Sequence, residues 1–127
     1  QDLTLVDDES RAGPLYQWIA RRANEWSTNG NVGLVVGATY PKELETVRSI
    51  CPSMPILAPG LGAQGGDLRA SVLAGIDATG RNLLVSSSRS ILYASRDKTA
   101  FADAARRAAQ RLRDDINDVL EGVGKEW

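Results

Sequence analysis

Two polar segments, each following an apolar run, carry residue types that bind an anion. The first is the loop over residues 58–67, where Gln64 is the one long polar side chain and can donate and accept hydrogen bonds. Its proline and glycines, which let backbone N–H groups approach a ligand, are Pro59, Gly60, Gly62, Gly65 and Gly66. The second segment, residues 86–89, ends in Ser88 and Arg89, whose guanidinium keeps its charge and offers a planar set of donors. Together they predict a phosphate site.

Each of these features also has a structural explanation. The glycines could simply form a tight turn, and Arg89 could pair with a carboxylate. Thr39 follows another apolar run and could bind a ligand, but a turn residue or a helix cap before Pro41 explains it equally well. Because two anion-binding segments follow successive apolar runs, we favour the functional interpretation.

The apolar pattern predicts the elements that position these residues. Continuous apolar runs at 32–36, 55–58 and 82–86 predict three strands buried on both faces. Helices are expected from Pro14 to 26, from Pro41 to 50, from Asp67 to about 76 and from Lys98 to about 121. A short turn is expected over 91–95, and residues 1–9 are expected to form a loop.

Regular alternation of helices with buried strands predicts a parallel α/β architecture, with residues 1–127 as a single domain. Three strands cannot close an eight-stranded barrel, which usually needs about 250 residues. The chain is therefore either a small open sheet or the C-terminal half of a (β/α)₈ TIM barrel. In both architectures the ligand binds at the carboxyl ends of the strands.

Composition limits the classes of function. The 15 Lys and Arg against 16 Asp and Glu give a net charge of −1, which argues against a nucleic-acid binder and a membrane-surface binder. The absence of histidine excludes a His-based triad and a His metal ligand. One cysteine, no apolar run near 18 residues and no signal-peptide pattern predict a soluble cytoplasmic protein. The start at Gln1 predicts the inside of a longer chain.

Residues for proton transfer are not evident. Lysine occurs only at Lys42, Lys98 and Lys125, in predicted helices or the tail, and none lies near an aspartate at a strand end. The sequence therefore predicts phosphate binding without an acid–base pair.

Three segments, residues 35–41, 59–67 and 84–93, resemble orotidine 5'-phosphate decarboxylase, most closely its bacterial long-chain branch. Their order and spacing agree with that family over most of residues 10–120. The P-G-x-G-A-Q-G-G pattern at 59–66 is the specific one. The resemblance implies a (β/α)₈ barrel of which this chain is roughly the C-terminal half, with its strands as the sixth, seventh and eighth.

The resemblance also implies roles for individual residues. Gln64 would touch the phosphate and the pyrimidine from a closing loop, and Arg89 with the backbone beside it, at Ser88, would bind the 5'-phosphate. Pro59 would pack near the pyrimidine, and Thr39 would lie by the mouth of the site. The family uses no metal or organic cofactor and is usually a homodimer with sites at the subunit interface.

The implied reaction converts orotidine 5'-phosphate to uridine 5'-phosphate (UMP) and CO₂. The family's catalytic Lys and Asp residues, in a D-x-K-x-x-D stretch, are absent here and are expected in the N-terminal half of the barrel, the implied partner of this chain. Two alternatives stay open. One is a non-catalytic half-barrel that binds phosphate or a nucleotide. The other is a different phosphate-binding barrel, such as a sugar-phosphate epimerase or synthase, although these generally lack the Ala-Gln-Gly-Gly lid glutamine.

Overall fold

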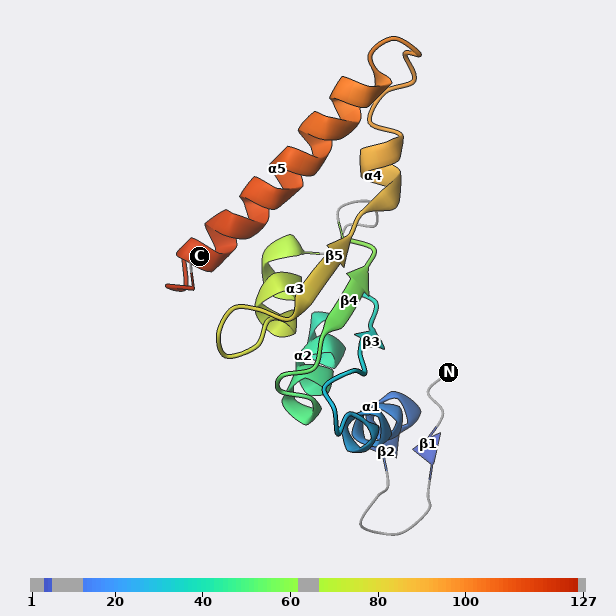
Figure 1. The fold of residues 1–127 in the computed structure, drawn as a ribbon, viewed down its shortest axis with the longest axis vertical. Helices are drawn as coiled ribbons and strands as arrows, with labels where there is room; N and C mark the ends of the chain where they lie inside the picture. Colours follow the sequence, from blue (N-terminus) through green and yellow to red (C-terminus); the bar gives the residue numbers. More distant parts are fainter. Residues whose placement is uncertain (1–3, 6–12, 62–66, 126–127) are drawn as a thin grey trace.

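The computed structural model describes residues 4–5, 13–61 and 67–125 of the 127-residue chain. Figure 1 shows the order of the elements along the chain. They are β1 (Thr4–Leu5), β2 (Gly13–Pro14), α1 (Leu15–Trp26), β3 (Leu34–Val35), α2 (Pro41–Ile50), β4 (Ile56–Pro59), α3 (Leu68–Gly75), β5 (Leu83–Ser86), α4 (Ser88–Leu92) and α5 (Phe101–Glu121).

The strands β3, β4 and β5 form a parallel sheet in that order. Ile56 of β4 pairs with Leu34 of β3 on one side and with Leu83 of β5 on the other. A helix follows each strand, as the alternating pattern predicts. The short strands β1 and β2 pair antiparallel, so the predicted loop over residues 1–9 contains two residues, 4 and 5, that are in a strand.

Helix boundaries follow local chemistry. Pro14 immediately precedes α1, and Pro41 is the first residue of α2, where a missing N–H costs nothing. Asp67 caps α3, because its carboxylate accepts a hydrogen bond of 3.1 Å from the backbone N–H of Ala70. These three helix starts confirm the prediction. Among the residues described, no helix has both the length and the apolar character needed to cross a membrane.

Two boundaries differ from the prediction. Helix α4 includes the first two residues of the turn expected at 91–95, so Arg89 lies within a helix. Helix α5 begins at Phe101, three residues later than expected. The carboxylate of Asp97 explains the delay, because it accepts hydrogen bonds from the backbone N–H and the hydroxyl of Thr99 at 2.8 and 2.7 Å. Such a turn competes with helical geometry.

The core lies behind the sheet, where α1, α2 and α3 pack (Figure 1). Leu44 and Val47 of α2 and Ile56 of β4 are almost completely buried in it. A second cluster joins α3 to α5 through Val72 and Leu120. Apolar burial of this kind is the main stabilising contribution to the fold.

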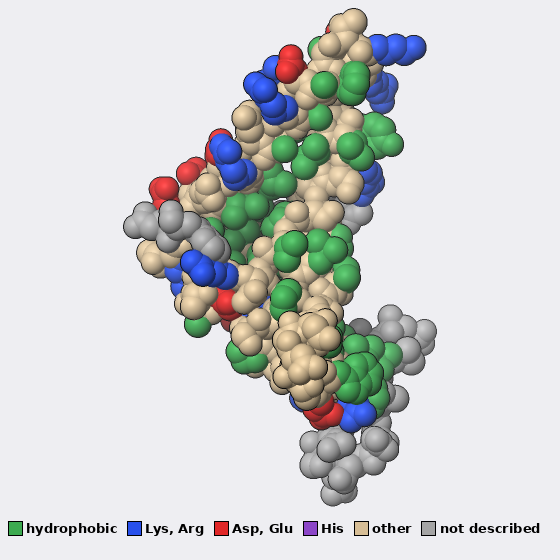
Figure 2. Space-filling model, viewed as in Figure 1, with side chains coloured by type: hydrophobic (Ala, Val, Ile, Leu, Met, Phe, Trp, Pro, Cys, Tyr) green, Lys and Arg blue, Asp and Glu red, His purple; other side chains and the backbone are tan. Residues whose placement is uncertain are grey.

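The opposite face of the sheet is uncovered. One row of side chains in register, Val35, Leu57 and Leu84, is 71%, 38% and 57% exposed. Figure 2 shows hydrophobic side chains gathered on this face and in the hollow beside α5. The prediction of burial on both faces is therefore wrong for the described chain, because its helices cover one face only.

The amino ends of the strands are held by a buried arginine. Arg48 of α2 is 8% exposed and donates hydrogen bonds to backbone carbonyl oxygens at the ends of α2 and α3 and just before β4 and β5. These acceptors are Cys51 at 3.0 Å, Pro52 at 3.4 Å, Met54 at 2.7 Å, Gly75 at 2.8 Å and Asn82 at 2.8 Å. The cation therefore lies at the negative ends of two helix dipoles. Burial lowers the pKa of Arg48, and the charges of Asp77 and Cys51 oppose that shift.

Candidate phosphate-binding site

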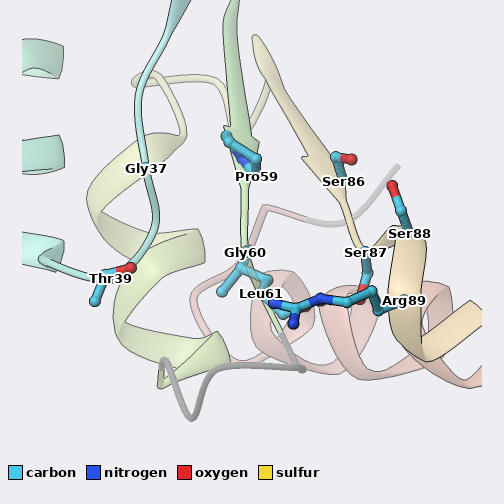
Figure 3. A pocket seen from close by; sticks show the side chains of 9 residues that line it. All are labelled: Gly37, Thr39, Pro59, Gly60, Leu61, Ser86, Ser87, Ser88 and Arg89. Carbon is cyan, nitrogen blue, oxygen red and sulfur yellow. Dashed lines mark hydrogen bonds between the residues drawn. The ribbon is translucent and has the colours of Figure 1, made fainter.

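A pocket of about 380 Å³ opens at the carboxyl ends of the three parallel strands. Figure 3 shows its lining, which comes from the segments that follow β3, β4 and β5. The lining residues are Gly37, Thr39, Pro59, Gly60, Leu61, Ser86, Ser87, Ser88 and Arg89. The structure thus brings together five residues that the sequence singled out, namely Thr39, Pro59, Gly60, Ser88 and Arg89.

Other predicted residues cannot be placed. Gln64, Gly62, Gly65 and Gly66 lie outside the described residues, so the closing role of Gln64 stays a prediction. Leu61 is the last described residue before this segment, and α3 follows it.

Of the described residues that line the pocket, Arg89 is the one with a charged side chain. It is exposed on α4, and its side chain extends from that helix toward Gly60 and Leu61 (Figure 3). Within the described residues Arg89 forms no salt bridge, whereas Arg22 and Arg113 do. The described part of the chain therefore gives no support to pairing of Arg89 with a carboxylate, and the guanidinium can bind an external anion.

Gly60 explains how the chain leaves β4. Its φ angle is +97°, a conformation that favours glycine over residues with a side chain. Its backbone N–H donates a hydrogen bond of 3.2 Å to the carbonyl oxygen of Ser86, which lies at the end of the neighbouring strand. The glycine therefore has a structural function at the turn and also keeps the pocket floor free of a side chain.

Thr39 lies on the other side of the pocket from Arg89, with Pro59 and Gly60 between them (Figure 3). It is exposed and not the residue that caps α2, since Tyr40 occupies that position without a side-chain hydrogen bond. The helix-cap interpretation of Thr39 is therefore wrong, while its place in the turn before Pro41 and at the pocket rim is compatible with a ligand contact.

Sequence reasoning missed how the pocket is held in shape. Ser87 is 7% exposed, and its hydroxyl donates a hydrogen bond of 2.6 Å to the carbonyl oxygen of Leu61. Ser71 is completely buried, and its hydroxyl donates a hydrogen bond of 3.1 Å to the carbonyl oxygen of Ala38. Neither serine occurs in a pattern that distinguishes it from a surface serine, because its partner lies far away in sequence.

Among the residues that the structure describes, the lining contains no carboxylate, lysine, histidine or cysteine. In the described ranges no cluster of three or more metal-ligating side chains occurs. The buried groups with shifted pKa values, Arg48, Cys51 and Asp77, belong to the opposite end of the strands. The described pocket can therefore bind an anion through Arg89 and hydroxyl groups, but it offers no group for acid–base catalysis.

Comparison with known proteins identifies the relatives of this chain. No protein-family model matches it. The chain is 57% identical over 112 residues to the orotidine 5'-phosphate decarboxylase of Thermomicrobium roseum, which covers 87% of this chain and 39% of the relative. With the decarboxylase of Roseiflexus castenholzii it shares 51% identity over 124 residues, covering 97% of this chain and 44% of the relative. The chain is homologous to a C-terminal part of orotidine 5'-phosphate decarboxylase.

Solved structures agree. The OMP decarboxylase of Leishmania donovani superposes with a TM-score of 0.73 at 40% identity, over 94% of this chain and 42% of that one. The UMP synthase of the same organism gives a TM-score of 0.69 at 40% identity, over 94% of this chain and 24% of that one. The sequence resemblance and the predicted fold class, a C-terminal part of a (β/α)₈ barrel, are therefore confirmed. The chain spans about two fifths of the length of the curated relatives it matches.

Proposed function

We propose that this chain supplies the phosphate-binding part of an orotidine 5'-phosphate decarboxylase, which converts orotidine 5'-phosphate to UMP and CO₂. One observation carries the proposal. The three sequence segments that resemble the decarboxylases each contribute residues to the lining of one pocket. There, Arg89 from α4 faces the turn that follows β4. A nucleotide monophosphate would place its phosphate against the guanidinium, since arginine binds phosphate through two parallel hydrogen bonds.

The described pocket has no acid or base, so in this proposal the residues that act on the reacting carbon come from the remaining part of the barrel. Phosphate binding still assists the reaction, because binding energy from a non-reacting part of the substrate offsets the cost of orienting and distorting the reacting part. Ser88 and Arg89 would hold the 5'-phosphate, and Pro59 and Thr39 would border the nucleoside. No cofactor or metal is needed in this division of roles.

The open face of the sheet supports a further barrel part as partner. Val35, Leu57 and Leu84 form an exposed apolar row, and β3 and β5 are the outer strands of the described three-stranded sheet. Outer strands present unpaired backbone groups that favour pairing with another strand. We propose that the N-terminal half of a decarboxylase barrel covers this row and pairs with both outer strands.

We propose two further properties: a homodimer, which rests on the resemblance alone, and a cytoplasmic location, which rests on the single cysteine and the lack of a long apolar run or signal-peptide pattern in the sequence. Sedimentation of a complete barrel tests the first, because a monomer at micromolar concentration would contradict it. Fractionation of cells that express a tagged full-length protein tests the second, where recovery in a membrane or secreted fraction would contradict it.

The test of the decarboxylase function uses a chimera. In the Thermomicrobium roseum enzyme, the 112 matching residues are replaced by those of this chain. The chimera should decarboxylate orotidine 5'-phosphate, followed by the change in absorbance of the pyrimidine. In it, Arg89→Ala should lower kcat/KM by about 10- to 150-fold, because a hydrogen bond to a charged group contributes about 1.5–3 kcal/mol.

The matched control is Arg96→Ala. Arg96 is an exposed arginine seven residues after Arg89 in the sequence, and it does not line the pocket. It should leave kcat/KM within about twofold of the unmodified chimera, as expected for a surface position. A folded chimera that binds UMP without decarboxylating its precursor would favour the non-catalytic half-barrel. Equal effects of the two arginine substitutions would contradict the role of Arg89.

A further inference from the structure

The segments that line the pocket are hydrogen-bonded to one another. The backbone N–H of Ala38 donates to the carbonyl oxygen of Pro59 at 3.1 Å. The backbone N–H of Gly60 donates to the carbonyl oxygen of Ser86 at 3.2 Å. These two bonds continue the sheet into the turns, so they fix the ends of the strands. They do not reach α4, which carries the arginine.

Side-chain hydrogen bonds connect α4 to the rest of the pocket. The buried hydroxyl of Ser87 donates to the carbonyl oxygen of Leu61 at 2.6 Å, and its oxygen lies 2.5 Å from the hydroxyl oxygen of Ser90. A serine hydroxyl has one hydrogen to donate and two lone pairs that accept. Because the hydrogen of Ser87 is directed to Leu61, Ser90 is the donor in the second bond. A chain of two hydrogen bonds thus runs from Ser90 through Ser87 to Leu61.

The two serines of this chain of hydrogen bonds lie on either side of the arginine in the sequence. Arg89 lies between Ser87 and Ser90 in the sequence, and none of the five residues of α4 is buried. Leu61, in contrast, is completely buried at the start of the glycine-rich segment. Helix α4 packs along α5, and the hydroxyl of Ser87 adds a hydrogen bond from the start of α4 to Leu61 on the pocket side.

We propose that Ser87 is a positioning residue for the phosphate site. With Ser90, its hydroxyl fixes α4 against the buried carbonyl group of Leu61 and so sets the direction in which Arg89 reaches the anion. The proposal rests on the proposed function of this pocket. Ser87 itself does not donate a hydrogen bond to the ligand, since its one hydroxyl hydrogen is directed to the carbonyl oxygen of Leu61.

Removing the hydroxyl has a specific consequence. Ser87→Ala leaves the carbonyl oxygen of Leu61 without this donor and leaves the Ser90 hydroxyl with only the backbone carbonyl oxygen of Ser87, at 3.3 Å, as an acceptor. The helix α4 then samples more orientations, and Arg89 is directed at the phosphate for less of the time. In the chimera we expect KM to rise and kcat/KM to fall about 10-fold, which corresponds to a loss of about 1.4 kcal/mol.

A double-mutant cycle distinguishes positioning from general stability. Ser87→Ala is measured in the chimera and again in the chimera that carries Arg89→Ala. If Ser87 acts through Arg89, its substitution should change kcat/KM by less than about twofold once the arginine is gone, because interacting residues are not additive. A 10-fold loss in both backgrounds, or no loss in either, overturns the proposal.

Ser71→Ala is the matched control. It removes another buried serine hydroxyl that donates to a backbone carbonyl oxygen, but that carbonyl belongs to Ala38, between the lining residues Gly37 and Thr39 and away from α4. Its effect should therefore be the same with and without Arg89. If Ser87→Ala does not fold, Ser90→Ala replaces it, because Ser90 is exposed and its substitution keeps the bond from Ser87 to Leu61 while removing the contacts of the Ser90 hydroxyl with the hydroxyl and carbonyl oxygens of Ser87. We expect a loss of about threefold that again disappears without Arg89, and a loss that persists overturns the proposal.

The same double-mutant cycle is repeated with the dissociation constant of UMP, measured by calorimetry, in place of kcat/KM. This keeps the inference separate from the decarboxylase proposal, because an inactive chimera that binds UMP still reports the coupling between Ser87 and Arg89. Failure of the decarboxylase proposal appears in the unmodified chimera and in Arg89→Ala alone. Failure of the positioning proposal appears only as additivity of the Ser87 substitution.

Discussion

Replacement of Arg48 by methionine should destabilise the fold severely without changing the site. Its guanidinium holds backbone carbonyl groups at the amino ends of β4 and β5 and at the carboxyl ends of α2 and α3. Methionine fills much of the same volume and is apolar, so it supplies none of the donors. The carbonyl groups would then lie buried without their partner, which is more costly than never having made the bond.

The magnitude follows from the number and burial of these contacts. Three of the five bonds, those to Cys51, Met54 and Gly75, are buried. Each buried carbonyl that loses its donor costs about 1–3 kcal/mol, but such losses are not additive. Three such losses set a lower bound of about 3 kcal/mol, and the lack of additivity keeps the total well below about 9 kcal/mol. We therefore expect the free energy of unfolding to fall by about 3–5 kcal/mol, a large part of the 5–15 kcal/mol typical of a domain.

Urea unfolding of the chimera, followed by tryptophan fluorescence and circular dichroism, measures this loss. Arg48→Lys retains the charge with fewer donors, so it should lose about half as much. Arg107→Met is the control, because Arg107 is exposed on α5 and its substitution should change stability by less than about 0.5 kcal/mol. A cost below about 1 kcal/mol for Arg48→Met would refute the reasoning, as would a change in KM of the folded variant, since Arg48 lies at the end of the strands opposite the pocket.

Three further predictions follow from other parts of the structure. Gly60→Ala should lower the free energy of unfolding by about 1–2 kcal/mol and also lower kcat/KM, because the φ angle of Gly60 is +97°. Gly37→Ala is the control for stability, because an added Cβ at Gly37 meets no atom within 4 Å. Asp77 has a lowered pKa, since hydrogen bonds from residues 79, 81 and 82 outweigh the effect of burial, which alone would raise it. The carboxylate of Asp77 therefore contributes its full stabilisation above the unfolded-state pKa of about 3.9, and this contribution is lost as the pH falls below that value. When the free energy of unfolding is measured by urea unfolding at a series of pH values, Asp77→Asn should reduce its fall at acidic pH. Cys51 is buried, and burial raises the pKa of its thiol against the opposing charge of Arg48, so a thiol reagent should label it only after unfolding, as peptide mass mapping can show.

Local sequence rules predicted the parts of the fold that depend on neighbours in the chain. Pro41 and Asp67 mark helix starts because a fixed φ angle and a capping carboxylate act within one turn. The apolar runs predicted the three parallel strands, and the polar residues that follow them predicted which end would hold the pocket. Two residues that line the pocket, Pro59 and Arg89, were predicted in this way.

Contacts between distant segments were not predictable by the same rules. The hydroxyl of Ser87 meets a carbonyl 26 residues away, and the Arg48 guanidinium meets one 34 residues away. A buried arginine in a helix looks like any surface arginine until its carbonyl partners are known. The prediction that the strands are buried on both faces was wrong for a different reason. An apolar run such as 32–36 reflects everything that packs on a strand, and the described chain, which spans about two fifths of its relatives, covers only one face.

The two ends of the sheet therefore separate stability from binding. At the amino ends, Arg48 and Asp77 are surrounded by hydrogen-bonding partners. Burial lowers the pKa of Arg48, whereas hydrogen bonds outweigh burial and lower the pKa of Asp77. At the carboxyl ends, Arg89 is exposed and has no salt bridge within the described residues, so its charge is available to a ligand. A search for function by shifted pKa alone would select the wrong end. What distinguishes a binding residue from a structural one here is whether its charged group already has hydrogen-bonding partners within the described residues. By that criterion, the pocket beside Arg89 is the part of the described chain best suited to bind an anion.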